Sequence, residues 1–164
     1  MELMQTARKG HHFISRCIMI MIIVMIAYGA YTLLCDVNKP RPVVVRAGQA
    51  TLQAEIAETA EQRYKGLSDR SGLTDNQAML FKFEGDDKWE MVMRNMSFPL
   101  DIIWLDKDKK VVHIEHEVQP DAEPYEIYKP KVPARYVLEL AAGVAKKSSI
   151  VKGTKVEFTI EATQ

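Results

Sequence analysis

The chain has 164 residues, of which 22 are basic and 22 acidic, so its formal net charge is zero. That length suits one domain of ordinary size with an appendage. The absence of net positive charge argues against non-specific nucleic-acid binding through a basic field, and a hydrophobic content of 47% excludes a wholly disordered chain.

An uncharged, strongly apolar run extends from Cys17 to Cys35. As a helix, its 19 residues would extend about 28 Å, close to the ~30 Å thickness of the bilayer hydrocarbon. We therefore predict a transmembrane helix over residues 17–35. A cleaved signal sequence is the alternative, because Ala27 and Gly29 have the small-x-small spacing of a cleavage site.

The charges flanking this run predict its orientation. Arg16 directly precedes the run, whereas Asp36 directly follows it, and positive charge favours the cytoplasmic side. Residues 1–16 are thus expected to form a short cytoplasmic tail, and residues 36–42 a proline-containing tether. Residues 43–164 would then form a domain outside the cytoplasmic membrane, and the chain would be a single-pass membrane protein whose first partner is the lipid bilayer.

The domain sequence is dominated by short runs typical of β-strands, separated by turn residues. The expected strands are 43–46, 51–57, 78–83, 89–93, 101–105, 110–118, 135–140 and 155–160. The charged turn Asp106 to Lys109 predicts a hairpin between two of them.

Two short helices complete the prediction. Thr59 and Gln62 have the spacing of a capping box, and Gly66 follows as a helix stop; a second helix is expected within residues 141–149. Because no helices separate most successive strands, we expect a mainly β domain. Its architecture would be an antiparallel β-sandwich or partly closed barrel with two short helices, preceded by one transmembrane helix.

Four ordered sequence blocks carry a family resemblance. They are Arg63-x-x-Gly66-Leu67-x-x-Arg70, Met79-Leu80-Phe81-x-Phe83, Met93-Arg94-Asn95-x-x-x-Pro99-Leu100-Asp101-Ile102-Ile103 and Tyr136-Val137-Leu138-Glu139-Leu140-x-Ala142-Gly143. In these blocks, residues 50–158 resemble the bacterial and archaeal domain of unknown function 192 family. The resemblance implies a compact, mostly β domain, often behind a secretory or membrane signal, and it implies no established reaction.

Six polar residues of these blocks are candidates for a ligand site: Arg63, Arg70, Arg94, Asn95, Asp101 and Glu139. Asp101 and Glu139 each share a strand face with apolar residues, where a carboxylate must be paired. Arginine forks are natural partners for them. One interpretation is a structural ion-pair network. The other is a cleft that binds an anionic or carbohydrate-like envelope ligand, and a third option is an envelope hydrolase that uses the two carboxylates as acid and base.

Methionines provide one further alternative. Met91, Met93 and Met96 could bind Cu(I) together with His113 or His116, although methionines at this spacing more simply fill a core.

The domain contains no cysteine, which excludes thiol chemistry. No phosphate loop, dinucleotide fingerprint or hydrolase elbow is present, so we expect no cofactor and leave enzymatic activity undecided. The sequence therefore predicts a membrane-anchored extracytoplasmic binding or interaction module.

Overall fold

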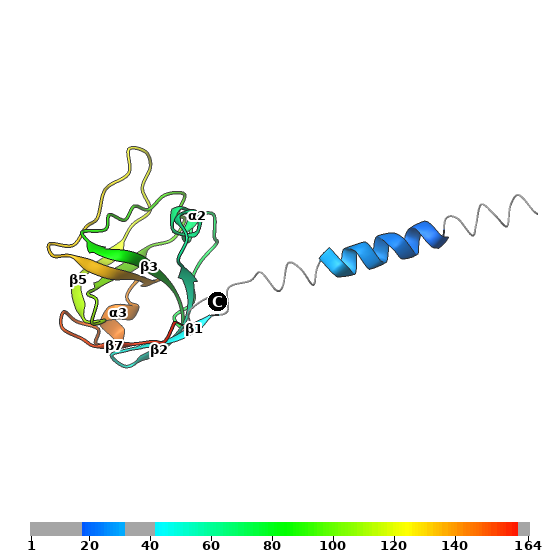
Figure 1. Cartoon of the computed structure of the whole chain (residues 1–164). Coiled ribbons are helices and arrows are strands. Elements are labelled where there is room, and N and C mark those ends of the chain that lie inside the picture. Colours follow the sequence, from blue (N-terminus) through cyan, green and yellow to red (C-terminus); the bar gives the residue numbers. More distant parts are fainter. Residues whose placement is uncertain (1–17, 32–41, 161–164) are drawn as a thin grey trace, which may run out of the picture. The chain divides into compact units, whose positions relative to one another are not determined.

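The computed structural model describes residues 18–31 and 42–160 (Figure 1). The chain divides into two compact units, Met1–Pro40 and Arg41–Gln164. In the first unit, residues 18–31 are helical and their large apolar side chains are exposed. Among the described residues, no helix combines the length and the apolar character needed to cross a membrane. The predicted tail 1–16, the ends of the predicted span 17–35 and most of the tether 36–42 lie outside the described residues.

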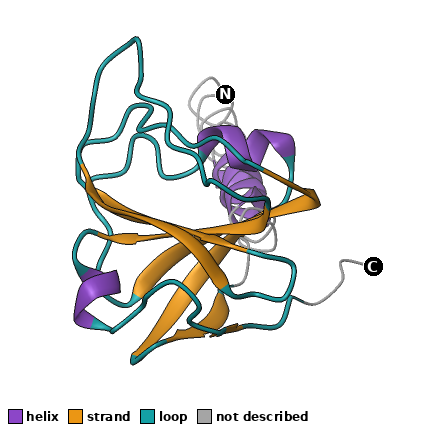
Figure 2. Cartoon of the chain, turned by 90° about the vertical axis from the view of Figure 1, so that its left-hand side faces the viewer, coloured by secondary structure: helices purple, strands orange, loops and turns teal. Residues whose placement is uncertain are grey.

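The second unit is built on one seven-stranded sheet. Its strands are β1 (Val43–Ala47), β2 (Ala50–Ala57), β3 (Gln77–Asp87), β4 (Leu100–Leu105), β5 (Val111–Val118), β6 (Ala134–Ala141) and β7 (Val156–Glu157). Their order is β5-β4-β6-β3-β2-β1-β7. The sheet curls until its outer strands approach each other, and an isolated bridge joins Lys110 to Lys155. Figure 2 shows the curled strands with long loops at one end of the domain.

The curled sheet forms a half-barrel, which confirms the predicted mainly β class. The predicted antiparallel arrangement of the strands needs correction. The strand pairs are antiparallel except β2 with β3, which run parallel. The sheet is thus mixed, and it curls on itself rather than forming a two-sheet sandwich. The parallel pair is possible because residues 58–76, which include α2 (Ala60–Lys65), carry the chain back across the sheet before β3 begins.

Both short helices predicted in the domain are present. Thr59 caps α2, and Gln62 completes the capping box through its side chain. Gly66 ends the helix with a positive φ of 47°, a conformation that glycine adopts without steric cost. The later helix α3 (Val144–Lys147) occupies only the middle of the predicted range 141–149.

Two predicted strands differ from the structure. Residues 89–93 form no strand, and only an isolated bridge pairs Met91 with Tyr128. Their alternating pattern arises because Met91 and Met93 pack into the core and Trp89 stacks on Phe83, with ring centroids 4.1 Å apart. The predicted strand 155–160 shrinks to the two residues of β7.

The sheet carries a hydrophobic cluster on each face. One cluster contains Leu80, Ile103 and Leu138, and the other contains Phe81, Ile102 and related side chains. The alternation follows from the period of two along each strand. The candidate site lies over the second cluster.

Candidate functional site

A cleft of about 340 Å³ opens beside α2, over the second hydrophobic cluster. Its walls are mostly aromatic and aliphatic, and its charged members are mostly cationic. The lining residues that matter most are Arg63, Tyr64, Lys65, Leu67, Phe81, Phe83, Met91, Arg94, Met96, Leu100 and Glu139. Five of the sequence candidates (Arg63, Arg94, Glu139, Met91 and Met96) are therefore brought together.

Glu139 contributes the only buried carboxyl group among the described residues that line this cleft. It lies on β6 opposite Met79 of β3 and Ile102 of β4, and only 5% of its surface is exposed. No described residue donates a hydrogen bond to its carboxyl group. Burial raises its pKa from 4.5 to about 8, although the charge of Arg70 acts in the opposite direction. Near neutral pH the group thus holds its proton and can donate a hydrogen bond.

Arg63 connects α2 to the sheet and forms part of the cleft wall. Its Nη1 donates to the carbonyl oxygens of Glu58 and, over 3.1 Å, of Lys82. Its guanidinium group lies 5.1 Å from the centre of the Phe83 ring. These contacts hold the side chain in place, and its other N–H groups have no acceptor among the described residues.

Arg94 is held by α2 in a similar way. Its guanidinium group stacks 4.1 Å from the centre of the Tyr64 ring, and its Nη1 donates to the Tyr64 carbonyl oxygen over 3.3 Å. Ser68 further fixes this segment, because its hydroxyl donates to the Arg94 carbonyl oxygen over 2.7 Å. The cation is thus positioned at the cleft without being neutralised by a carboxylate.

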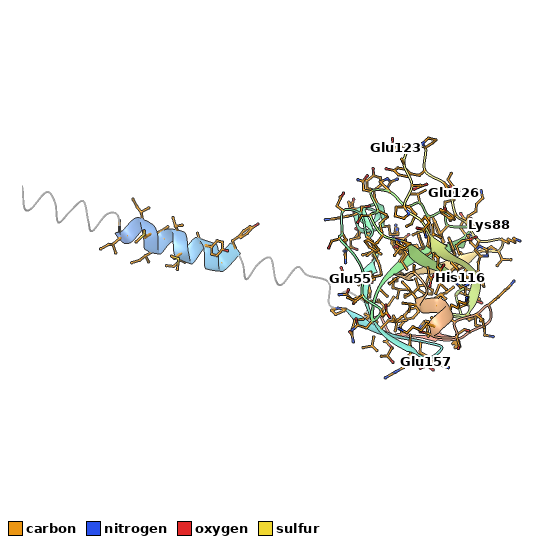
Figure 3. The ribbon with its side chains drawn as sticks, turned by 180° about the vertical axis from the view of Figure 1, so that it is seen from behind. Glu55, Lys88, His116, Glu123, Glu126 and Glu157 are labelled. Atoms are coloured by element: carbon orange, nitrogen blue, oxygen red, sulfur yellow. The ribbon has the colours of Figure 1, made fainter. Side chains whose placement is uncertain are left out.

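Arg70 has a different partner from the one predicted. It forms a two-pronged ion pair with Glu55, over 2.6 and 2.8 Å, and this hydrogen bonding is the main cause of its raised pKa. Glu55 (Figure 3) and Glu139 lie on either side of Met79 in the sheet. Arg70 therefore interacts electrostatically with both carboxyl groups. The direct acid partner of Arg70 is thus Glu55, and among the described residues no arginine forms an ion pair with Asp101 or Glu139.

Asp101 lies on the other face of the sheet. It pairs with Leu140 on β6, one residue from the pairing of Ile102 with Glu139, and a shift of one residue reverses the face. Its fully buried carboxyl group accepts hydrogen bonds from the backbone amides of Glu117 (2.9 Å) and Ala145 (2.8 Å). Asp101 and Glu139 are thus not a facing pair of carboxyl groups.

Asn95 and the methionines have mainly structural positions. Asn95 is an exposed turn residue with a φ of 51°, and its Oδ1 accepts a long hydrogen bond of 3.4 Å from the Tyr125 hydroxyl. Met93 is fully buried, whereas Met91 and Met96 reach the cleft. In the described part of the chain, no group of three or more His, Cys, Asp or Glu residues could hold a metal ion.

Sequence reasoning missed Tyr64 and Lys65 as members of the site. Both are on the last turn of α2, and 69% of the Tyr64 surface is exposed. The available signal was this exposed aromatic residue between Arg63 and Lys65 on a helix that begins with a capping box. It did not indicate a site without knowledge of where residues 90–96 fold.

Comparisons with known proteins agree on a family. Residues 43–158 match the DUF192 family, described as Uncharacterized ACR. The UPF0127 protein of Thermococcus gammatolerans is 29% identical over 108 residues, which cover 65% of this chain and 66% of that protein. A UPF0127 protein of Thermococcus kodakarensis is 25% identical over 109 residues, covering 65% of each chain. The chain thus matches slightly less than two thirds of the length of these relatives.

Two crystal structures have a similar fold. A Sinorhizobium meliloti protein, provisionally named a transcription regulator, superposes with a TM-score of 0.68 and 30% identity, covering 73% of this chain and 95% of that one. A Novosphingobium aromaticivorans protein of unknown function gives a TM-score of 0.65 and 32% identity, covering 71% and 83%.

Proposed function

This chain belongs to the DUF192 family, and from that premise we propose that its domain is a binding module. The cleft beside α2 would hold a small ligand with an apolar body and an anionic group. This proposal narrows the anionic or carbohydrate-like envelope ligand predicted from the sequence.

The unpartnered carboxyl group of Glu139 is the observation that carries the proposal. Only 5% of the Glu139 surface is exposed, and keeping a carboxyl group this far from water without a hydrogen bond from the protein costs free energy. A protein that only needed to fold could place an apolar residue here, as it does at the neighbouring Val137 and Ile102. A ligand oxygen at the bottom of the cleft would accept the hydrogen bond that the protonated carboxyl group offers.

The charges around the cleft favour an anion. Arg63, Lys65 and Arg94 contribute three cations. The acid Glu90 also lines the cleft, but it is paired with Lys129 over 3.2 Å. Glu139 is largely uncharged at neutral pH, so the local balance is positive and complements a carboxylate, phosphonate or phosphate group.

The alternative functions receive no support from the geometry. The hydrolase hypothesis needs two carboxyl groups on one site, and Asp101 and Glu139 point to opposite faces. The copper hypothesis needs three methionine sulfurs in reach, and Met93 is buried in the core. Neither is proposed further.

Titration of the full-length chain in lipid nanodiscs tests the anion site. Phenylphosphonate is the probe and benzyl alcohol is its neutral counterpart, with ¹³C-labelled methionine methyl groups as the NMR reporters. We expect phenylphosphonate to shift the Met91 and Met96 signals and to bind at least tenfold more tightly than benzyl alcohol. Arg94→Gln should weaken phenylphosphonate binding by about tenfold, equivalent to about 1.4 kcal/mol.

Arg46→Gln is the matched control, because Arg46 is exposed on β1 outside the cleft. It should bind phenylphosphonate as the wild type does. Equal affinity for the two probes, or an unchanged affinity of Arg94→Gln, would contradict the proposal.

We further propose that this module is held outside the cytoplasmic membrane by residues 17–35. Support comes from the uncharged run itself and from the exposed apolar side chains over residues 18–31. An exposed apolar surface of this kind requires an apolar partner, and the bilayer is the one that the length of the run fits.

A further inference from the structure

A second groove, of about 370 Å³, lies along β5 and is separate from the cleft beside α2. One wall is β5 itself, through residues 112–114 and His116 (Figure 3). Lys131 and Val132 of the proline-rich loop, together with residues 150–152, contribute the rest of its lining. None of its lining residues belongs to the cleft proposed above.

The strand in this wall has an unpaired edge. β5 is the last strand of the sheet, and β4 is its neighbour on one side. On the other side, the Val111 amide donates to Thr154 and the Val111 carbonyl oxygen accepts from Gly153, over 2.9 and 2.8 Å. Beyond Val111, no other described segment continues this backbone ladder. At Glu117 the amide already donates to Asp101 and the carbonyl oxygen accepts from Gln119. The edge from Val112 to His116 thus offers backbone donors and acceptors to an extended chain.

The lining residues have the chemistry of a peptide groove. Val132 and Val151 are 44% and 61% exposed, which provides apolar contacts for alternate side chains. Lys131 and Lys152 are exposed cations, and no aspartate or glutamate lines the groove. The nearby acid Glu115 is hydrogen-bonded to the ring of His113 over 2.7 Å.

We propose that this groove binds an extended, acidic segment of a partner protein by strand addition to β5. The partner's main chain pairs with the free edge of β5. Its apolar side chains contact Val132 and Val151, and its carboxylates contact Lys131 and Lys152. The unpaired edge selects an extended chain over a helix, and the uncompensated lysines select an acidic one over a basic one.

The probe for this interaction is a capped, fluorescein-labelled octapeptide of alternating glutamate and valine. An alternating lysine–valine octapeptide has the same apolar pattern and the opposite charge. With the full-length chain in nanodiscs of zwitterionic lipid, we expect the acidic peptide to bind at least tenfold more tightly than the basic one. We also expect amide hydrogen exchange in residues 112–116 to slow when the acidic peptide binds.

The double variant Lys131→Glu/Lys152→Glu should weaken binding of the acidic peptide at least tenfold. The control Lys88→Glu/Lys107→Glu has the same change of net charge at two exposed lysines outside the groove (Lys88 is labelled in Figure 3), and it should bind as the wild type does.

Four outcomes would overturn the proposal. They are no binding of the acidic peptide at about 1 mM, equal affinity for both peptides, wild-type affinity in the groove variant, and unchanged exchange in β5. Displacement of the peptide by inorganic phosphate beyond the effect of sodium chloride at equal ionic strength, combined with the unchanged exchange in β5, would instead identify a site for small anions. The peptide test does not depend on the cleft beside α2, because the two sites share no lining residues. Failure of phenylphosphonate to bind that cleft would therefore not count against peptide binding to β5.

Discussion

Glu139 links the stability of the domain to pH. Its pKa is raised to about 8 in the folded chain, mainly by burial, whereas an unfolded glutamate titrates near 4.5. Between these two values the folded state binds more protons than the unfolded state. The free energy of unfolding contributed by this group is therefore fully present below pH 4.5 and is lost as the pH rises through about 8.

We expect the wild type to lose stability over that range by an amount on the order of 5 kcal/mol, at about 1.36 kcal/mol per pKa unit. Glu139→Gln keeps the shape of the side chain and cannot ionise, so its stability should depend much less on pH. Urea unfolding of the domain signal at pH 5, 6.5 and 8 measures the difference. Glu157→Gln, at an exposed position of β7 (Figure 3), is the control and should keep the wild-type dependence. An equal pH dependence in Glu139→Gln and the wild type would contradict this explanation.

For single residues, the sequence identified the polar side chains that stand on apolar strand faces, but it did not identify the contacts that they make. Glu139 was identifiable because it interrupts an apolar strand face. Arg70 was proposed as a partner for the buried carboxylates, and its charge does act on Glu139. The direct ion pair of Arg70 with Glu55 was not identifiable, because the place of Glu55 beside Met79 depends on the parallel register of β2 with β3. Similarly, Asp101 and Glu139 looked equivalent by alternation, and only the β4–β6 register places them on opposite faces.

Asp101 connects three secondary-structure elements, β4, β5 and α3, through the hydrogen bonds of its carboxyl group. From β4 its carboxyl group accepts the amide of Glu117 in β5 and the amide of Ala145 in the first turn of α3. The local N-cap of α3 is Gly143, which provides no side-chain acceptor. Asp101 therefore supplies from a distant strand the hydrogen bond that an N-cap residue normally supplies.

Removing this carboxyl group should weaken the packing of α3 and the end of β5. We expect Asp101→Ala to lower the free energy of unfolding by about 3 kcal/mol, since it leaves two backbone amides without an acceptor. Asp101→Asn keeps one acceptor oxygen and should lose roughly half as much. Urea unfolding gives both values, and hydrogen exchange at Ala145 locates the effect. A loss below about 1 kcal/mol for Asp101→Ala would show that solvent or another group replaces the carboxylate.

Element prediction succeeded where a local cause determines the structure. The capping box at Thr59 and the charged turn 106–109 act within a few residues, and both are present as expected. Residues 89–93 have the alternation of a strand, yet they form a loop whose methionines pack into the core. Alternation predicts burial on one side, and it cannot distinguish a paired strand from a loop segment lying on a core.

At the scale of the whole molecule, the mainly β class followed from the sequence, whereas the strand order did not. The sequence predicted an antiparallel architecture and one hairpin, and it specified no other strand pairing. In the structure β6 inserts between β3 and β4, and β7 pairs with β1. No local pattern in a single sequence specifies these long-range pairings.

The placement of the chain in the cell is the remaining prediction at this scale. If residues 17–35 span the bilayer, the full-length chain should sediment with the membranes of a bacterial host. Protease added to spheroplasts should digest the domain and leave a small membrane-bound fragment, because the domain is expected outside the cytoplasmic membrane. Survival of the whole chain would instead indicate the reverse orientation.

Substitutions within the run separate insertion from adventitious sedimentation. Each lysine at the centre of a transmembrane helix costs about 2.5–3.5 kcal/mol, so Ile22→Lys/Ile26→Lys should move the chain into the soluble fraction. Ile22→Leu/Ile26→Leu preserves the apolar character and should remain with the membranes. If the lysine variant also stays with the membranes and remains resistant to carbonate extraction, residues 17–35 are not the anchor. The anionic ligand of the cleft and the acidic partner of β5 would then have to be sought without assuming an envelope location.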